Sequence, residues 1–231
     1  MSRTQIFASP DEAVGVVKDG DTVLVGGFGL AGMPFDLIDA LIRHGAGGLT
    51  IVSNNAGNGD VGLAALLKAG RVRRILCSFP RQVDSYVFDD LYRRGQIELE
   101  VVPQGNLAER MRAAGAGIGA FYCPTGVGTP LAEGKETRTI DGRDYVLEYP
   151  IKGDVALISA HAADTAGNLV YRKTARNFGP VMAAAATTTV VQVASIVDAG
   201  GIDPEAVVTP GIYVDRVVQV EPRHYTVQGA R

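Results

Sequence analysis

The sequence predicts an α/β fold with an open, largely parallel sheet, helices on both faces and a β-hairpin insertion. Three observations support this prediction. Short apolar runs typical of buried strands alternate with amphipathic helical segments from residue 21 to about residue 115. The connections between these segments are short, which favours parallel strands joined by crossover helices. Further along the chain, an Asp-Gly pair between two strand-like runs is typical of a hairpin.

The first elements have clear start and stop signals. A helix is expected from Ser9 to about Lys18, because Ser9 can cap it and Pro10 suits its first turn. A strand follows over 21–27. The next helix, over 34–45, begins at Pro34 and ends at Gly45. The same alternation then continues, with strands predicted over 49–53, 73–79 and 97–103 and helices over 60–70, 84–95 and 106–115.

The regular alternation of strands and helices ends near residue 115. Residues 115–134 are rich in glycine and proline and form a loop too long for a simple connection, which is typical of functional loops. A hairpin is expected over 137–150, turning at Asp141-Gly142. Strands over 154–161 and 167–171 share a turn at 164–168. A helix from Gly179, a strand over 187–197 and a last strand over 212–220 complete the prediction.

Composition bounds the class of protein. The chain has 231 residues, is 46% hydrophobic and 20% charged, and shows no internal repeat, so we expect one globular domain over 1–231. A net charge of −3 with scattered basic residues argues against a nucleic-acid footprint. No apolar run is long enough for a membrane span. The two cysteines lack metal-ligand spacing, and we expect a reduced, cytoplasmic protein without a metal site.

The glycine-rich segment from Asp21 to Pro34 reads DTVLVGGFGLAGMP, and Gly27–Gly32 fits the dinucleotide pattern G-x-G-x-x-G. That function also requires an acid at the end of the next strand, about 20 residues on. Asn54 and Asn55 stand there instead, and Pro34 starts the helix too late for its N–H groups to meet a phosphate. A P-loop is excluded as well, because no G-K-[ST] follows. Two readings stay open: a tight β–α turn, or a loop whose N–H groups face a carboxylate or thioester oxygen.

Polar side chains follow three other predicted strands. Because parallel strands end at one edge of an open sheet, these residues are expected close to the glycine loop. Each can hold a carboxylate or carbonyl oxygen by hydrogen bonds, and one adds a positive charge. As single residues they are equally typical of turns and helix caps. They are Asn54, Asn55, Arg81, Gln82 and Gln104.

No convincing catalytic nucleophile emerges from the residues alone. The three histidines, His44, His161 and His224, lie in unrelated contexts without a G-x-S-x-G elbow. Cys77 falls in a predicted buried strand and is expected to be inert, whereas Cys123 has no paired base. Glu133 is a carboxylate beside a glycine and suits a nucleophile by type only. The chain therefore offers a binding surface without a catalytic group.

A longer motif is more specific than the glycines. Residues 19–34, DGDTVLVGGFGLAGMP, resemble throughout the signature of the A (α) subunit of family I coenzyme A-transferases. The resemblance continues in SNNAG, VPQGNLAER, GAGIGAFYCPTGVGT, EGKE, RKTARNFGP and VTPGIYVDRVV, and covers essentially the whole chain. It implies an open-sheet fold shared with ribose-5-phosphate isomerase-like proteins.

The resemblance also implies a reaction and a divided site. CoA moves from an acyl-CoA to a free carboxylic acid through a glutamyl-CoA intermediate, and the nucleophilic glutamate belongs to a partner B subunit. No catalytic residue is thus assigned to this chain, Glu133 is no longer a candidate, and no tightly bound cofactor is implied, the CoA thioester being a substrate. A heterodimer or A2B2 heterotetramer is expected. The implied CoA-binding residues are Gly26, Gly27, Phe28, Gly29, Leu30, Ala31 and Gly32.

Within the family, CSFPRQVDSYVFDDLY resembles the A subunits of 3-oxoadipate CoA-transferases more than those of acetoacetate-type enzymes. Asn54, Asn55 and Gln104 match positions that line the acyl or carboxylate pocket. We further hypothesise that Arg81 pairs with the second carboxylate of 3-oxoadipate, with succinyl-CoA as donor. The alternatives are one chain of a succinyl-CoA:acetoacetate or short-chain acyl transferase, a nicotinamide-dependent dehydrogenase and a non-catalytic ligand sensor.

Overall fold

The computed structural model describes residues 4–222. Within them, the main sheet holds nine strands in the order β1-β12-β11-β9-β2-β3-β4-β5, and β10 pairs with β9. Every pairing in this sheet is parallel except that of β9 with β10, which confirms the largely parallel prediction. The strands are β1 (Gln5–Phe7), β2 (Thr22–Val25), β3 (Leu49–Val52), β4 (Val72–Cys77), β5 (Glu98–Val101), β9 (Gly153–Asp164), β10 (Leu169–Val170), β11 (Ala186–Val197) and β12 (Arg216–Gln219).

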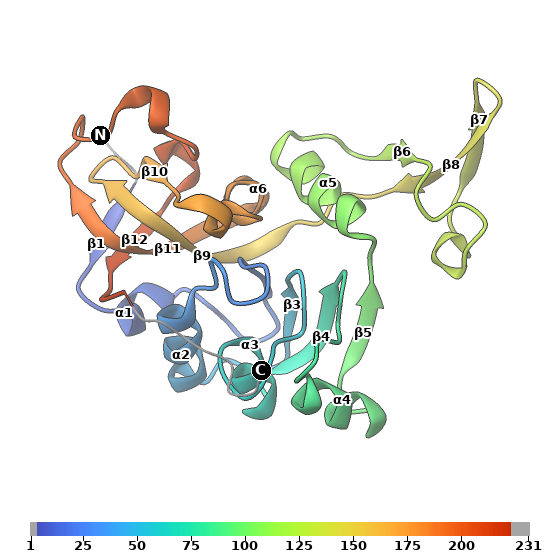
Figure 1. Cartoon of the computed structure of the whole chain (residues 1–231), viewed down its shortest axis with the longest axis horizontal. Helices are drawn as coiled ribbons and strands as arrows, with labels where there is room; N and C mark the ends of the chain where they lie inside the picture. The colour runs from blue at the N-terminus through green and yellow to red at the C-terminus, as the bar shows by residue number, and fades with distance from the viewer. Residues whose placement is uncertain (1–3, 223–231) are drawn as a thin grey trace.

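Helices cover both faces of the sheet, as expected (Figure 1). One face carries α1 (Pro10–Val14), α2 (Phe35–His44), α3 (Leu63–Lys68) and α4 (Tyr86–Arg93), and the other carries α5 (Gln104–Gly115) and α6 (Gly179–Ala185). Successive side chains of β2 point to opposite faces of the sheet, so this strand contributes to the hydrophobic core on each face. Val23 and Val25 join the core under α1–α4, whereas Leu24 joins the core under α5 and α6.

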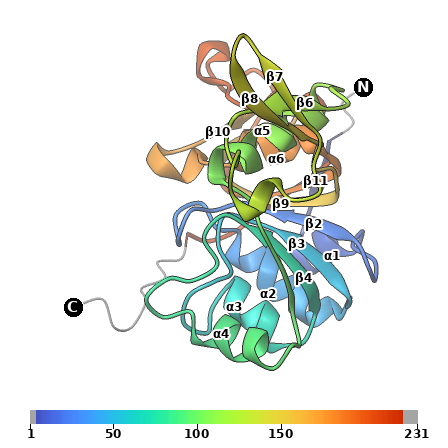
Figure 2. The same ribbon diagram turned by 90° about the vertical axis from the view of Figure 1, so that its right-hand side faces the viewer.

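A second, three-stranded antiparallel sheet projects from the main body (Figures 1 and 2). It contains β6 (Phe121–Cys123), β7 (Thr137–Ile140) and β8 (Arg143–Glu148) in the order β6-β8-β7. The predicted hairpin is confirmed: Asp141 and Gly142 both have positive φ, of 50° and 75°, as a two-residue hairpin turn requires. The stretch 115–134 was expected to be loop throughout, which is wrong for 121–123, because these residues pair with β8.

Two boundaries at the ends of the chain also differ from expectation. The first helix ends at Val14 rather than near Lys18, and the last strand covers 216–219 only, because Gly211–Tyr213 form a 3-10 turn after Pro210. The short strand β1 was not predicted. It forms because Gln5–Phe7 pair with the edge of β12 that faces away from β11, across more than two hundred residues of sequence. No helix in residues 4–222 is long and apolar enough to cross a membrane.

Candidate active site at the carboxyl edge of the sheet

The glycine loop begins where β2 ends and turns back on itself. The Phe28 N–H donates to the Ala31 carbonyl at 3.0 Å, and the Ala31 N–H donates to the Phe28 carbonyl at 3.2 Å. Gly29 lies inside this turn with φ of 61°, a conformation that favours glycine. The turn leaves the Phe28 ring 51% exposed. The loop is therefore a tight turn that presents an aromatic face to solvent.

Asn177, from a distant part of the chain, forms hydrogen bonds to both sides of this loop. Its Oδ1 accepts the Gly27 N–H at 3.1 Å, and its Nδ2 donates to the Ala31 carbonyl at 2.9 Å. Asn177 directly follows the 3-10 turn η2 (Lys173–Arg176). A Cβ at Gly32 would overlap the Ala175 carbonyl of η2, so glycine is required for this approach. Asn177 was not predicted as a site residue, although it lies in the family-like stretch RKTARNFGP.

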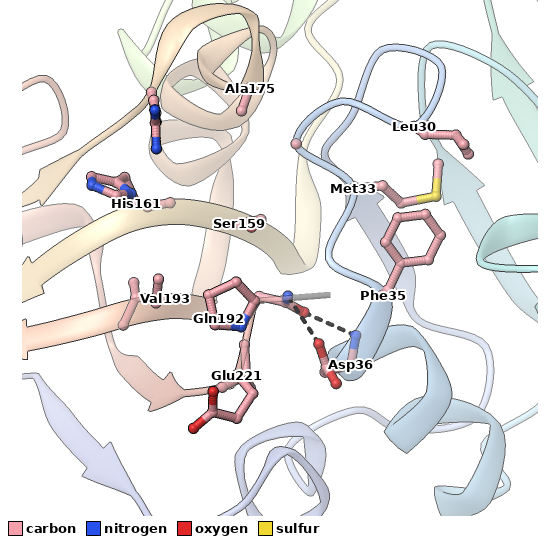
Figure 3. A pocket seen from close by; sticks show the side chains of 16 residues that line it. Leu30, Met33, Phe35, Asp36, Ser159, His161, Ala175, Gln192, Val193 and Glu221 are labelled. Carbon is pink, nitrogen blue, oxygen red and sulfur yellow. Dashed lines mark hydrogen bonds between the residues drawn. The ribbon is translucent and has the colours of Figure 1, made fainter. Parts of the chain in front are cut away.

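The N-terminus of α2 is closed to a phosphate. Pro34, which precedes the helix, offers no side-chain cap, and Gln192 on β11 takes that role instead. Its Oε1 accepts the N–H groups of Asp36 and Leu37 at 3.1 and 3.2 Å. Figure 3 shows Gln192 beside Asp36. These helix N–H groups are thus already satisfied inside the protein, which removes the anion site that a dinucleotide would use.

A cavity of about 230 Å³ lies between this capped helix and the strands β9 and β11. Figure 3 shows Met33 and Phe35 on one side of it and Ser159 and His161 of β9 on the other. The cavity borders the glycine loop through Leu30. It therefore lies on the β9 side of the glycine loop, whereas β3 lies on the other side of β2.

Amide side chains meet at the ends of β3 and β4 and at the start of α5. The buried Asn54 accepts at Oδ1 from Gln104 Nε2 at 2.6 Å and from Ser78 Oγ at 2.8 Å. Two donors on one oxygen fix the orientation of the Asn54 amide. Its Nδ2 donates to no acceptor in the described part of the chain. The structure therefore brings Asn54 and Gln104 together, as predicted, and adds Ser78 to them.

Next to this cluster, two buried polar atoms have no partner within residues 4–222. Asn55 Oδ1 accepts the Gly57 N–H at 2.8 Å, but Asn55 Nδ2 and Ser53 Oγ make no hydrogen bond there. Buried polar groups are normally paired, because leaving one unpaired costs about 1–3 kcal/mol. Such unsatisfied groups at the carboxyl edge of a sheet are typical of a site that is completed by a ligand or a partner.

Arg81 lies outside this cluster of amides. Its Nε donates to Asp89 of α4 at 2.6 Å, and its side chain is 57% exposed. The two Nη atoms have no partner among residues 4–222. Gln82 is held at its backbone, where its N–H donates to Ser85 Oγ at 2.8 Å. The segment after β4 is thus anchored on α4 while the Arg81 guanidinium still has free donors.

The structure separates the nucleophile candidates by environment. Cys77 is completely buried, and burial raises the pKa of its thiol to about 12, so the prediction of an inert core cysteine is confirmed. Cys123 is half-buried, and its Sγ donates to Asn106 at 3.2 Å. Glu133, His44 and His161 are exposed, and His224 lies outside the described residues. No group of three or more His, Cys, Asp or Glu side chains suits a metal ion within 4–222.

Fold and site together define an open α/β protein with a glycine turn and fixed amide side chains at the carboxyl edge of its sheet. A family model described as coenzyme A transferase matches residues 7–220. The chain therefore belongs to the coenzyme A transferase family.

Two curated relatives and one solved structure illustrate this membership. The chain is 66% identical over 214 residues to the A subunit of the 3-oxoadipate CoA-transferase of Pseudomonas putida, which covers 93% of each chain. It is 49% identical to the A subunit of a probable succinyl-CoA:3-ketoacid coenzyme A transferase of Bacillus subtilis, covering 93% of this chain and 89% of that one. An acyl-CoA transferase of Escherichia coli O157:H7, solved as a thioester complex with CoA, aligns with a TM-score of 0.85 and 26% identity. The alignment covers 98% of this chain and 51% of that longer chain.

Proposed function

We propose that this chain is the A subunit of a 3-oxoacid CoA-transferase that moves CoA from succinyl-CoA to 3-oxoadipate. The observation that carries the proposal is the amide cluster of Asn54 and Gln104 with the neighbouring Asn55, which follow strands at the carboxyl edge where β2 and β3 are adjacent. These amides can hold a carboxylate or a carbonyl oxygen, which are the two groups that a CoA-transferase exchanges. The names of the relatives from Pseudomonas putida and Bacillus subtilis support the substrate class and the role as one chain of a two-chain enzyme.

The reaction divides between two chains. The thioester carbonyl of succinyl-CoA is attacked by a glutamate of the partner B subunit, which forms an acyl-glutamyl anhydride and expels the CoA thiolate. The thiolate attacks the glutamyl carbonyl, giving glutamyl-CoA and free succinate. The 3-oxoadipate carboxylate then attacks glutamyl-CoA, and the expelled thiolate takes the 3-oxoadipyl group from the new anhydride. No further cofactor is needed, because the activated thioester supplies the driving force.

In this proposal the present chain orients the reactants. The segment from Gly26 to Gly32 holds the CoA side of the site. The Nδ2 groups of Asn54 and Asn55 face the oxygen that bears charge in the anhydride-forming step, and Gln104 keeps the Asn54 amide in place. Arg81 offers its free Nη donors to the distal carboxylate of 3-oxoadipate, while Asp89 fixes the side chain through Nε.

Reconstitution of the two-chain enzyme tests the proposal. The chain would be co-expressed with the neighbouring reading frame, and succinyl-CoA-dependent transfer would be measured with 3-oxoadipate and with acetoacetate. We expect transfer by the complex only, with 3-oxoadipate preferred. Full activity of this chain alone would contradict the divided site, and a preference for acetoacetate would favour the short-chain 3-oxoacid alternative. The capped N-terminus of α2 argues against a dehydrogenase, and NADH should not shift the melting temperature.

A further inference from the structure

A buried carboxylate lies where the projecting sheet of β6, β7 and β8 joins the main body. Glu148, the last residue of β8, is 3% exposed and is the one buried glutamate among residues 4–222. Its Oε1 accepts from Lys135 Nζ at 2.8 Å and from Asn106 Nδ2 of α5 at 3.1 Å. Its Oε2 lies 3.8 Å from Arg110 Nε, which also belongs to α5. Because a buried charge needs such partners, this carboxylate holds β8 and α5 in one arrangement.

The projecting sheet binds both the nitrogen and the oxygen of the Asn106 amide. The Asn106 Nδ2 donates to Glu148 of β8, and the Asn106 Oδ1 accepts from Cys123 Sγ of β6 at 3.2 Å. The Asn106 side chain is 2% exposed. Figure 1 shows β6 and β8 leaving the main body beside α5. With a partner on each of its two polar atoms, the Asn106 amide is held in one orientation.

The first turn of α5 also contains Gln104, the residue that donates to Asn54 in the amide cluster. Gln104 and Asn106 are two positions apart, so their side chains leave the helix in directions about 200° apart. One hydrogen bond therefore holds the turn from the side of the amide cluster, and the other holds it from the side of the projecting sheet.

The start of α5 has no local cap that would fix it independently. Pro103 precedes the helix and provides no side-chain hydrogen bond to its N–H groups. The nearest members of the hydrophobic core are Val102 before the turn and Leu107 after it. Between these two residues, the turn is held by the side-chain hydrogen bonds of Gln104 and Asn106. The position of Gln104 therefore depends on the contact between Asn106 and the projecting sheet.

We propose that Glu148 is a positioning residue for CoA transfer, acting through Asn106 and Gln104 on the amide of Asn54. The inference rests on the proposed function, which places Asn54 Nδ2 at the oxygen that bears charge. If the turn shifted, Gln104 Nε2 would move away from Asn54 Oδ1, and the Asn54 amide would lose one of its two orienting donors. A misplacement of about 1 Å can lower a rate about 10²-fold. The loss should fall on kcat, because the charge on that oxygen develops in the transition state.

Steady-state kinetics of the complex with the B subunit tests this inference. In Glu148→Ala and in Asn106→Ala, kcat should fall about 10–100-fold, whereas KM for succinyl-CoA and KM for 3-oxoadipate stay within about threefold. Glu148→Gln keeps an oxygen for Asn106 Nδ2, so kcat should stay within about threefold of the wild type although the melting temperature falls with the lost ion pairs. Glu136→Ala is the matched control and should keep the wild-type kcat, since Glu136 accepts from Tyr122 of the same projecting sheet.

A double-mutant cycle separates positioning from a general loss of stability. In Gln104→Ala, the Asn54 amide has already lost this donor, so adding Glu148→Ala should lower kcat by no more than about twofold further. A further loss as large as that of Glu148→Ala alone would show that Glu148 acts without Gln104, and the proposal would be wrong.

The outcomes separate this inference from the proposed function. If the wild-type complex transfers no CoA, the proposed function fails, and a crystal structure of Asn106→Ala, which keeps the ion pairs of Glu148, still decides the positioning role. A distance above about 3.5 Å between Gln104 Nε2 and Asn54 Oδ1 would support it. The wild-type distance of 2.6 Å would overturn it. If the complex is active but Glu148→Ala and Asn106→Ala keep the wild-type kcat, the positioning role is wrong while the proposed function stands.

Discussion

At the scale of single residues, the amide of Asn54 is oriented by two donors on one oxygen. Ser78 and Gln104 donate to its Oδ1, and its Nδ2 donates to no acceptor in residues 4–222. In Asn54→Asp, the same two donors can still bind one oxygen, but the other oxygen places a negative charge opposite the substrate carboxylate. We expect kcat/KM to fall about 10²–10³-fold, together with a lower melting temperature, because the second carboxylate oxygen is charged, buried and unpaired. Gln96→Glu, the same charge change on an exposed residue before β5, is the control for initial-rate measurements.

Arg81 decides between two acceptor acids in the proposed function. In Arg81→Gln, KM for 3-oxoadipate should rise about tenfold, because one charged contact to the distal carboxylate is lost, whereas KM for acetoacetate should not change. Arg94→Gln is the matched variant, since Arg94 is an exposed arginine directly after α4 that pairs with Asp90 of this helix. Equal increases for both acids in Arg81→Gln would show that Arg81 does not recognise the second carboxylate.

Because the Cys77 thiol is buried, we expect the free energy of unfolding to fall at alkaline pH. Burial raises the pKa of its thiol from 9.0 to about 12, so the unfolded chain loses the proton first as the pH rises. The contribution of the protonated Cys77 thiol to the free energy of unfolding is therefore complete below pH 9. It is lost between pH 9 and 12, by about 1.4 kcal/mol per pH unit. Urea unfolding of Cys77→Ala should show a flatter decline in this window than the wild type. Cys123→Ala, the loss of a thiol outside the core, should keep the wild-type slope.

At the scale of elements, the contact between the glycine turn and η2 depends on Gly32. It has φ of 72°, and a Cβ there would also lie 2.8 Å from Asn177 Nδ2. Gly32→Ala should therefore lower the free energy of unfolding by roughly 2–4 kcal/mol and raise KM for the CoA thioester. Gly29→Ala has a similar φ of 61° but open space around the new methyl group. Its cost should be only about 1–2 kcal/mol by chemical denaturation, and equal losses would contradict a packing role for Gly32.

Sequence signals predicted most elements because those signals act locally. The Ser9 cap, the left-handed Gly45 after α2 and the Asp141-Gly142 turn all lie where expected. Each depends on hydrogen bonds or dihedral angles within a few residues. The strands β1 and β6 were missed for the opposite reason. Both are three residues long and exist through pairing with distant strands.

At the scale of the whole molecule, we propose that the chain folds as a single domain. The main sheet joins β1 at one end of the described chain to β12 at the other. The strand β9 then pairs with both β2 and β11, so that it links the two halves of the sequence. Thermal unfolding of the purified chain should therefore give one transition, with far-ultraviolet and near-ultraviolet circular dichroism changing together. Two separated transitions would contradict a single domain.

The sequence by itself determined the alternation of strands and helices, the glycine turn and the polar residues at the strand ends. Only the tertiary structure decided which of these residues meet. Asn177 reaches Gly27, and Gln192 caps Asp36, across 150 and 156 residues. Arg81 is held by Asp89 rather than by the amide cluster, and Asn106 of α5 contacts the buried Glu148 of β8. Periodicity and capping are local properties of a chain, whereas a site depends on contacts that form only when distant strands reach one edge of the sheet.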